Sequence, residues 1–364
     1  MTRDEIKYED LAELARYRDY LRQNPRLTYL FVELTDQCNL ACVHCGSSCS
    51  VEHSTRLDAD LLIRTLETVA EDFDPASVMI CLTGGEPLMH PAFGRIAEAI
   101  RDLGFSCGMT TNGTLIDSNM ARQLRRWRVD SITLSLDGLE ESHNRFRGGS
   151  GRVNSYQKTV EAIHALHGAG LPVQVTTVVH RQNYEELEAI WQLMLDWKVE
   201  SWRVINIEPI GRALEHPELL LTHVQLRSLL DFIRQKRYDP RSGELDVCYG
   251  CSHYLTPAYE REVRDNYFIC GSGIYVASIL CNGDIYSCLD IQRRPELVQG
   301  NIATDRFSEA WYHRFREFRK DRTAGCRDCE TCRERLYCGG DSAHTWDYDC
   351  NRPMLCFAQS DETQ

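Results

Sequence analysis

The chain has 364 residues, with 54 acidic and 41 basic side chains and a formal net charge of −13. This length accommodates two or three domains with ample core, and the acidic balance argues against nonspecific nucleic-acid binding. No basic and apolar signal sequence opens the chain, and no run reaches the roughly 18 apolar residues of a membrane span. We therefore expect a cytoplasmic protein whose seventeen cysteines act as metal ligands rather than as disulfides.

Short β-branched runs alternate with longer amphipathic segments along the first two thirds of the chain. Such runs indicate strands and such segments indicate helices. Strands are expected at 29–34, 78–83, 106–111, 131–136, 173–179 and 202–207. Helices are expected at 59–72, 91–103, 118–127, 155–169, 184–197 and 222–236.

Six strand-then-helix units predict an α/β fold, because each crossover between parallel strands needs a helix-length connection. The expected architecture is a partial (β/α)6 TIM-like barrel followed by a small cysteine-rich α+β domain. The expected parts are an N-terminal helical segment at 1–27, the barrel at 28–240, a bridging region at 241–267, the cysteine-rich domain at 268–358 and a tail at 359–364.

Three cysteines, Cys38, Cys42 and Cys45, follow the first expected strand in the run CNLACVHC. Thiolates bind iron–sulfur clusters, and a four-iron cluster normally takes four of them. A tight group of three therefore implies either a distant fourth ligand or an iron kept open for a small molecule. Structural zinc sites show two separated cysteine pairs instead. The alternative is three free thiols in a cysteine-rich chain.

The second and third expected strands end in GGEP and TTNG. Gly84 and Gly85 permit unusual backbone angles and close approach of a ligand, Glu86 offers an acceptor for an ammonium group, and Pro87 and Asn112 complete the two motifs. In parallel barrels the chemistry gathers at the carboxyl ends of the strands. The alternative for GGEP is a plain strand-to-helix turn with proline in the first turn.

The fourth expected strand carries Ser135 and Asp137 in the run LSLDG. Alternation along a strand puts both side chains on one face. Two oxygen-bearing side chains aimed the same way could bind ribose hydroxyls, and the alternative is a cap at the strand end.

The order and placement of these motifs resemble the radical S-adenosylmethionine family, over residues 28–240. The resemblance implies a [4Fe–4S] cluster on Cys38, Cys42 and Cys45, whose open iron is chelated by the amino and carboxylate groups of S-adenosylmethionine. One electron from the cluster then cleaves the sulfonium to methionine and a 5′-deoxyadenosyl radical, which removes a hydrogen atom from the substrate.

The same resemblance implies the contacts of the cofactor. GGEP meets the methionine ammonium, Asn112 of TTNG belongs to the cofactor-binding set, and Ser135 and Asp137 meet the ribose. Arg147, in the run RFRGG, resembles a position that contacts the cofactor carboxylate. The protein then supplies orientation and protection from side reactions, while the cofactor carries the radical chemistry.

The C-terminal third holds eight cysteines, enough for two fully ligated clusters. This region resembles the SPASM extension, the auxiliary-cluster domain of peptide-modifying relatives, which makes the expected cysteine-rich domain an iron–sulfur domain. The resemblance implies one or two auxiliary [4Fe–4S] clusters, with two favoured. The cysteines are Cys270, Cys288, Cys326, Cys329, Cys332, Cys338, Cys350 and Cys356.

The chain departs from the SPASM pattern at one ligand. Ser342 stands where the family usually places a cysteine, and Cys326 is an additional thiol. Either Cys326 or Cys350 could replace the missing ligand, or one auxiliary cluster could stay three-coordinate and open to substrate. A zinc ribbon that begins at Cys326 and uses the next three cysteines is the structural alternative.

Several groups have no firm place in these motifs. Cys248 and Cys251 form a C-x-x-C that is either a ligand pair or two thiols near a redox centre. Asp290 and His344 are candidate active-site groups. A small buried hydrophobe is the expectation for each remaining cysteine, and a thiol facing the cavity could instead donate a hydrogen atom. These are Cys49, Cys81, Cys107 and Cys281.

The resemblance implies an oxidoreductase-type maturase that modifies a ribosomally synthesised precursor peptide by crosslinking, epimerisation or a related oxidation. A flavodoxin or ferredoxin would be its reductase. Residues 1–27 are too few for a recognition module, so recognition of a leader would need the barrel surface, the bridging region or a separate leader-recognition protein. Tetrapyrrole or other small-cofactor maturation is an alternative, since His44 in CVHC resembles such relatives. Formylglycine formation in a sulfatase and a non-catalytic iron–sulfur electron carrier are the others.

Overall fold

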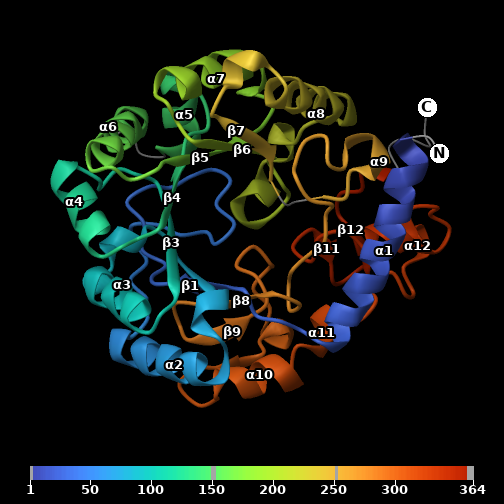
Figure 1. The fold of residues 1–364 in the computed structure, drawn as a ribbon, viewed down its shortest axis with the longest axis horizontal. Helices are drawn as coiled ribbons and strands as arrows, with labels where there is room; N and C mark the ends of the chain where they lie inside the picture. Colours follow the sequence, from blue (N-terminus) through green and yellow to red (C-terminus); the bar gives the residue numbers. More distant parts are fainter. Residues whose placement is uncertain (1–2, 149–152, 251–252, 359–364) are drawn as a thin grey trace.

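The computed structural model describes residues 3–148, 153–250 and 253–358. Within them, ten strands form one sheet in the order β10-β9-β8-β1-β2-β3-β4-β5-β6-β7. The sheet curves around a central loop, with helices on its outer side (Figure 1). The six predicted strands are β1 (Tyr29–Glu33), β2 (Met79–Thr83), β3 (Ser106–Thr111), β4 (Ser131–Ser135), β5 (Gln174–Val179) and β6 (Ser201–Asn206).

The predicted parallel partial barrel is confirmed, because β1 to β6 pair in parallel and in chain order. The helices between them turn an apolar side to the sheet. In α2, Leu62, Leu66 and Val69 are fully buried at helical spacing, and the carboxylate of Asp58 caps its first turn by accepting from Leu61 N. The outer helices are α2 (Ala59–Asp72), α3 (Phe93–Asp102), α4 (Ser118–Arg126), α5 (Glu140–Arg147), α6 (Ser155–Gly168), α7 (Leu187–Asp196) and α8 (His223–Arg237).

The sheet extends beyond the six predicted strands on both sides. β7 (Asp246–Tyr249) pairs in parallel with β6, and β8 (Val276–Ile279) pairs in parallel with β1. β9 (Asp284–Tyr286) and β10 (Gly300–Asn301) continue it in antiparallel fashion. Part of the expected C-terminal domain therefore shares the barrel sheet, which covers the β1 edge and its backbone hydrogen-bonding groups.

The rest of the C-terminal region consists of short helices and a small hairpin. None of the described helices is long and apolar enough to cross a membrane. The elements are α9 (Thr256–Tyr259), α10 (Phe307–His313), α11 (Arg316–Arg319), α12 (Arg327–Glu330), α13 (Arg335–Cys338), β11 (Trp346–Asp347) and β12 (Arg352–Pro353).

The predicted N-terminal helical segment forms α1 (Arg3–Gln23), which lies along the C-terminal region rather than on the barrel helices (Figure 1). Lys7 Nζ binds Glu262 Oε1 at 2.7 Å, and Tyr8 Oη donates to Glu334 Oε1 at 2.9 Å. These bonds join segments that lie more than 250 residues apart in the chain. α1 therefore contacts both the bridging region and the C-terminal region and holds them together.

Candidate active site

The cysteine loop follows β1 and is held by the GGEP segment that follows β2. Gly85 N donates to Thr35 O at 2.7 Å and Glu86 N donates to Gln37 O at 2.9 Å. A Cβ on Gly85 would lie 2.2 Å from the carbonyl oxygen of Gln37 and 3.0 Å from the Cβ of Cys38. Only glycine lets the two backbones approach this closely, so GGEP positions the loop that carries the three cysteines.

The three predicted cysteines come together inside the barrel. Cys38 and Cys42 are buried together with Leu40 and Cys49, and Cys45 packs against them. The loop lies near the centre of the ring of strands, at the carboxyl end of β1 (Figure 1). Three thiols on one short loop, walled off from bulk water, suit three corners of an iron–sulfur cluster.

Hydrogen-bond donors surround these sulfurs. Leu40 N lies 3.5 Å from Cys38 Sγ, Asn112 Nδ2 lies 3.8 Å from Cys38 Sγ, and Arg147 Nη1 lies 3.9 Å from Cys42 Sγ. Burial raises the pKa of Cys38 to about 12 and that of Cys42 to about 11. Bound iron would supply the positive charge that holds both as thiolates, so the residues fit the cluster.

Arg212 also holds the cysteine loop, and sequence reasoning missed it. Its Nε donates to Cys42 O at 2.8 Å and its Nη1 donates to Cys49 O at 2.9 Å. Gly211, just before it, has φ +52°, and a Cβ there would lie 2.3 Å from Cys45 O. The Gly-Arg pair close after β6 was the only signal in the sequence.

Cys49 is a fourth thiol at the loop. A hydrogen bond with Cys49 lowers the pKa of Cys45 to about 6 and raises that of Cys49. Sequence reasoning treated Cys49 as a small buried hydrophobe, and it is indeed buried.

Glu86 is fully buried between β2 and β3. Its Oε1 accepts from Thr111 Oγ1 at 2.8 Å and from Leu88 N at 3.2 Å, and its Oε2 accepts from Asn112 N at 2.9 Å. Burial raises the pKa of its carboxyl to about 7. The carboxylate thus joins GGEP to TTNG, and its predicted contact with a methionine ammonium stays a prediction.

Asp137 and Arg147 form a buried ion pair beside the cysteine loop. Arg147 Nε donates to Asp137 Oδ2, and Val178 N donates to Asp137 Oδ1 at 2.7 Å. Both Asp137 oxygens therefore have protein partners. Ser135 is also buried, but it takes no part in this ion pair. The predicted ribose and carboxylate contacts of these residues stay predictions.

His44 of the CVHC run lies in a stack of three rings. Its ring is parallel to that of Phe146 at 4.3 Å, and Phe146 stacks on His180 at 4.0 Å. Arg147 Nη2 lies 3.5 Å from His44 Nε2. Burial and the nearby arginine lower the pKa of His44 well below its ordinary value, so the imidazole is neutral.

An acid–imidazole network joins the barrel to the C-terminal region. Glu208, after β6, contacts His344 Nε2 at 2.7 Å and His253 Nε2 at 3.3 Å. His253 Nδ1 in turn lies 3.1 Å from Asp341 Oδ2. Burial disfavours the imidazolium ions, but the carboxylates outweigh it and raise the pKa of His344 to about 9 and that of His253 to about 10. Sequence reasoning named only His344 of this network, because its partners come from distant segments.

Asp290 lies between this network and the cysteine loop. Its Oδ1 is 3.7 Å from the place that a Cβ on Gly46 would take. Its side chain is accessible to solvent. The pKa of its carboxyl is nevertheless raised, because the surrounding protein disfavours the charged form. His344 opposes this effect and Glu208 reinforces it. The two candidate groups from the sequence, Asp290 and His344, therefore act on each other electrostatically, and Asp290 lies beside the loop.

Four C-terminal cysteines line one small cavity: Cys329, Cys332, Cys338 and Cys356. Four thiols around a single cavity suit a fully ligated cluster. Cys326 is fully buried and shares a hydrogen bond with Cys329 that helps to raise the pKa of that thiol.

The other predicted auxiliary ligands lie apart from this cavity. Cys270 Sγ accepts from Ala343 N at 3.3 Å. Burial is the main cause that raises the pKa of Tyr348, and the nearby Cys270 and Cys288 raise it further. Cys350 is exposed. The structure thus groups four of the eight thiols, and the role of the rest stays a prediction.

The remaining thiols are dispersed. Cys81 and Cys107 are buried in β2 and β3, and Cys248 lies in β7. Cys281 N donates to Glu33 Oε2 at 3.1 Å. Cys251 and the tail at 359–364 lie outside the described residues.

The sequence is similar to two family models and to several curated proteins. The radical SAM superfamily model matches residues 32–194, and the SPASM iron–sulfur cluster-binding domain matches residues 270–333. An AdoMet-dependent heme synthase of Oleidesulfovibrio alaskensis is 27% identical over 335 residues, which cover 87% of this chain and 83% of that protein. The mycofactocin maturase MftC of Mycobacterium tuberculosis is 28% identical over 311 residues, 83% of this chain and 76% of that protein.

Two solved structures share the fold. SuiB of Streptococcus suis bound to S-adenosylmethionine has a TM-score of 0.71 at 19% identity, over 87% of this chain and 74% of that one. The enzyme anSMEcpe with AdoMet and a Cp18Cys peptide has a TM-score of 0.72 at 18% identity, over 93% and 95%. Together with the cysteine loop and the cavity of four thiols, the family matches show that this chain is a radical S-adenosylmethionine enzyme with a C-terminal SPASM domain.

Proposed function

We propose that this enzyme removes a hydrogen atom from a ribosomally synthesised precursor peptide. The carrying observation is the position of Asp290, a solvent-accessible carboxylate from the SPASM region that lies beside Gly46 of the cysteine loop. A substrate between the barrel and the SPASM region would therefore meet the radical site and an acid–base group together.

The chain's own residues divide the work. Cys38, Cys42 and Cys45 would hold the [4Fe–4S] cluster, which with S-adenosylmethionine supplies the radical that removes the hydrogen atom. When the substrate radical is oxidised further, Asp290 would accept the proton, and an auxiliary cluster held by the C-terminal cysteines would take up the electron.

A peptide substrate has support from two sides. The SPASM resemblance is to the auxiliary domain of peptide-modifying enzymes, and SuiB with the precursor peptide SuiA, like anSMEcpe with its peptide, has the fold described here. A maturase is also among the curated relatives.

The test uses anaerobically reconstituted enzyme with a candidate precursor peptide, a reductant and S-adenosylmethionine. We expect 5′-deoxyadenosine, and a peptide that loses two hydrogens on crosslinking or takes up one solvent deuterium in heavy water on epimerisation. Mass spectrometry reads both. A Cys42→Ala variant is the control that should form neither product, and cleavage of the cofactor without any change in the peptide would reject a peptide substrate.

Tetrapyrrole maturation is the second candidate, because three AdoMet-dependent heme synthases are 26–27% identical to this chain over 86–89% of its length. The same reaction with an iron–porphyrin in place of the peptide distinguishes the two. A mass change in the porphyrin with none in the peptide would favour this candidate. Formylglycine formation stays a prediction, and the electron-carrier alternative is set aside by the family assignment.

A further inference from the structure

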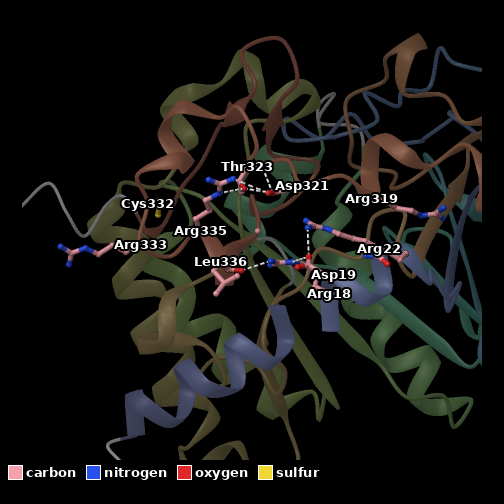
Figure 2. A pocket seen from close by; sticks show the side chains of 12 residues that line it. Arg18, Asp19, Arg22, Arg319, Asp321, Thr323, Cys332, Arg333, Arg335 and Leu336 are labelled. Carbon is pink, nitrogen blue, oxygen red and sulfur yellow. Dashed lines mark hydrogen bonds and ion pairs between the residues drawn. The ribbon is translucent and has the colours of Figure 1, made fainter. Parts of the chain in front are cut away.

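A cavity of about 650 Å³ opens where α1 meets the short helices of the SPASM region. Figure 2 shows side chains from the last turns of α1 and from the segment around α13 turned toward each other across it. We call it the arginine pocket. Its arginines are Arg18, Arg22, Arg319, Arg333 and Arg335.

The arginine pocket carries an excess of positive charge. Asp19 and Asp321 are its two acidic residues, so three positive charges are left over in a protein whose net charge is −13. Asp19 binds Arg22 at 3.0 Å, and Asp321 lies 3.5 Å from Arg335. These carboxylates are thus already used by two of the arginines. Arg319 donates to the carbonyl oxygens of Gly273 and Trp311, so an anionic ligand would meet the exposed Arg333 first.

Two buried donors of the arginine pocket have no hydrogen-bond partner in the described part of the chain. Arg18 Nη1 donates to the carbonyl oxygen of Tyr337 at 3.0 Å, and Arg18 Nη2 donates to that of Leu336 at 2.8 Å. Within the described part of the chain, the buried Nε atoms of Arg18 and Arg22 have no hydrogen-bond partner. Burial lowers the pKa of both side chains, and Arg322 adds to this for Arg22. A negative ligand would relieve this crowding of like charges.

The rim favours a protein over a small anion. Leu336 lines the arginine pocket with 55% of its surface exposed, and Tyr20, which lies on α1 outside the pocket lining, is 48% exposed. Tyr20 stacks with Tyr17, which is also 48% exposed. Arginine and tyrosine are enriched at protein interfaces, where such exposed aromatic surface becomes buried.

The arginine pocket adjoins the cavity of four thiols. Cys332, Arg335 and Thr323 line both, so a protein bound there would lie against the site of an auxiliary cluster. The cysteines of the barrel loop, in contrast, lie inside the ring of strands (Figure 1). Electrons pass between proteins only over short distances, and this surface adjoins a cluster site.

We propose that the arginine pocket is the docking site of an acidic electron-transfer protein of the flavodoxin or ferredoxin class. Acidic side chains of the partner meet the excess positive charge at Arg22 and the exposed Arg333, and Leu336 buries apolar surface beside them. Because the rest of the enzyme is acidic, repulsion elsewhere directs such a partner to this surface. The proposal does not depend on the peptide as substrate.

The test measures binding of an acidic flavodoxin to the immobilised, cluster-loaded enzyme under anaerobic conditions. The variant is the double charge reversal Arg22→Glu with Arg333→Glu. The matched control is Arg122→Glu, an exposed arginine on α4, across the barrel from α1 (Figure 1). We expect the double variant to weaken binding at least about tenfold and the control to change it less than about twofold. Binding by the wild type should also weaken as salt rises from about 0.05 M to about 0.3 M.

Equal binding by the wild type and the double variant would overturn the proposal. So would pyrophosphate that binds in the pocket without competing with flavodoxin, because the pocket would then be a small-anion site. A single Arg333→Glu variant, at the exposed rim, guards against misfolding, and an unchanged melting temperature and iron content should accompany its weaker binding. No peptide enters this assay, so its result is separate from that of the proposed function.

Discussion

His344 shows how a residue of weak standing in the sequence acquires a role from its neighbours. On the sequence it is one histidine among twelve. In the structure it contacts Glu208 at 2.7 Å, and Glu208 and Asp290 together raise its pKa to about 9 against the effect of burial. Asp137 shows the reverse case, since the predicted ribose ligand is engaged by Arg147 and Val178.

The raised pKa of His344 predicts a pH dependence of stability. A folded-state pKa above the unfolded value of about 6.5 means that the folded protein holds the extra proton. The stabilisation is therefore complete below about pH 6.5 and is lost as pH rises to about 9. We expect the melting temperature to fall over this window, and to fall less steeply in His344→Gln.

His313→Gln is the control for this measurement, because His313 is exposed, with 71% of its side chain accessible. It should retain the wild-type slope of melting temperature against pH. If His344→Gln shows the same slope as the wild type, the pair with Glu208 does not hold a proton in the folded state.

At the scale of elements, the loop after β2 is what arranges the loop after β1. The GGEP motif is visible in the sequence, but its contact with Gln37 is not, because the two segments lie nearly fifty residues apart and meet only when β1 and β2 pair. The strands themselves were predictable from their β-branched runs. The missed strands of this sheet, β7 to β10, are two to four residues long and depend on a neighbouring edge.

Gly85→Ala should therefore displace the cysteine loop. Its new Cβ would lie 2.2 Å from Gln37 O, which the backbone can relieve only by moving. We expect the reconstituted variant to bind about four fewer irons than the wild type, the content of one cluster, as measured by iron and sulfide analysis. Gly168→Ala, where a Cβ would meet no atom within 4 Å, is the matched control and should keep its iron. Full iron in Gly85→Ala would show that the loop tolerates the shift.

At the scale of the whole molecule, the SPASM region extends the barrel sheet past β1. It adds β8 beside β1, brings Asp290 to the cysteine loop and carries the cavity of four thiols. The sequence left the choice between Cys326 and Cys350 as a replacement ligand open. The structure puts Cys326 beside Cys329 and leaves Cys350 at the surface.

The cavity predicts which thiols matter for iron content. Cys356→Ser removes one of its four thiols and should lower the iron bound by the reconstituted enzyme by up to about four atoms. Cys350→Ser, at an exposed thiol, is the control and should bind iron as the wild type does. An equal loss in both variants would mean that Cys350 is also a ligand and that the cavity of four thiols is not a complete site.

The sequence by itself determined the family and the strand order of the barrel, and it predicted the three cysteines of a radical site. These depend on local patterns: strand periodicity, short cysteine spacing and glycines beside strand ends. Only the tertiary structure determined which distant side chains contact these segments. Segments far apart in the chain are joined by Arg212, by Glu208 with His253, and by the arginine pocket. No local pattern encodes which distant side chains will meet once the sheet has formed.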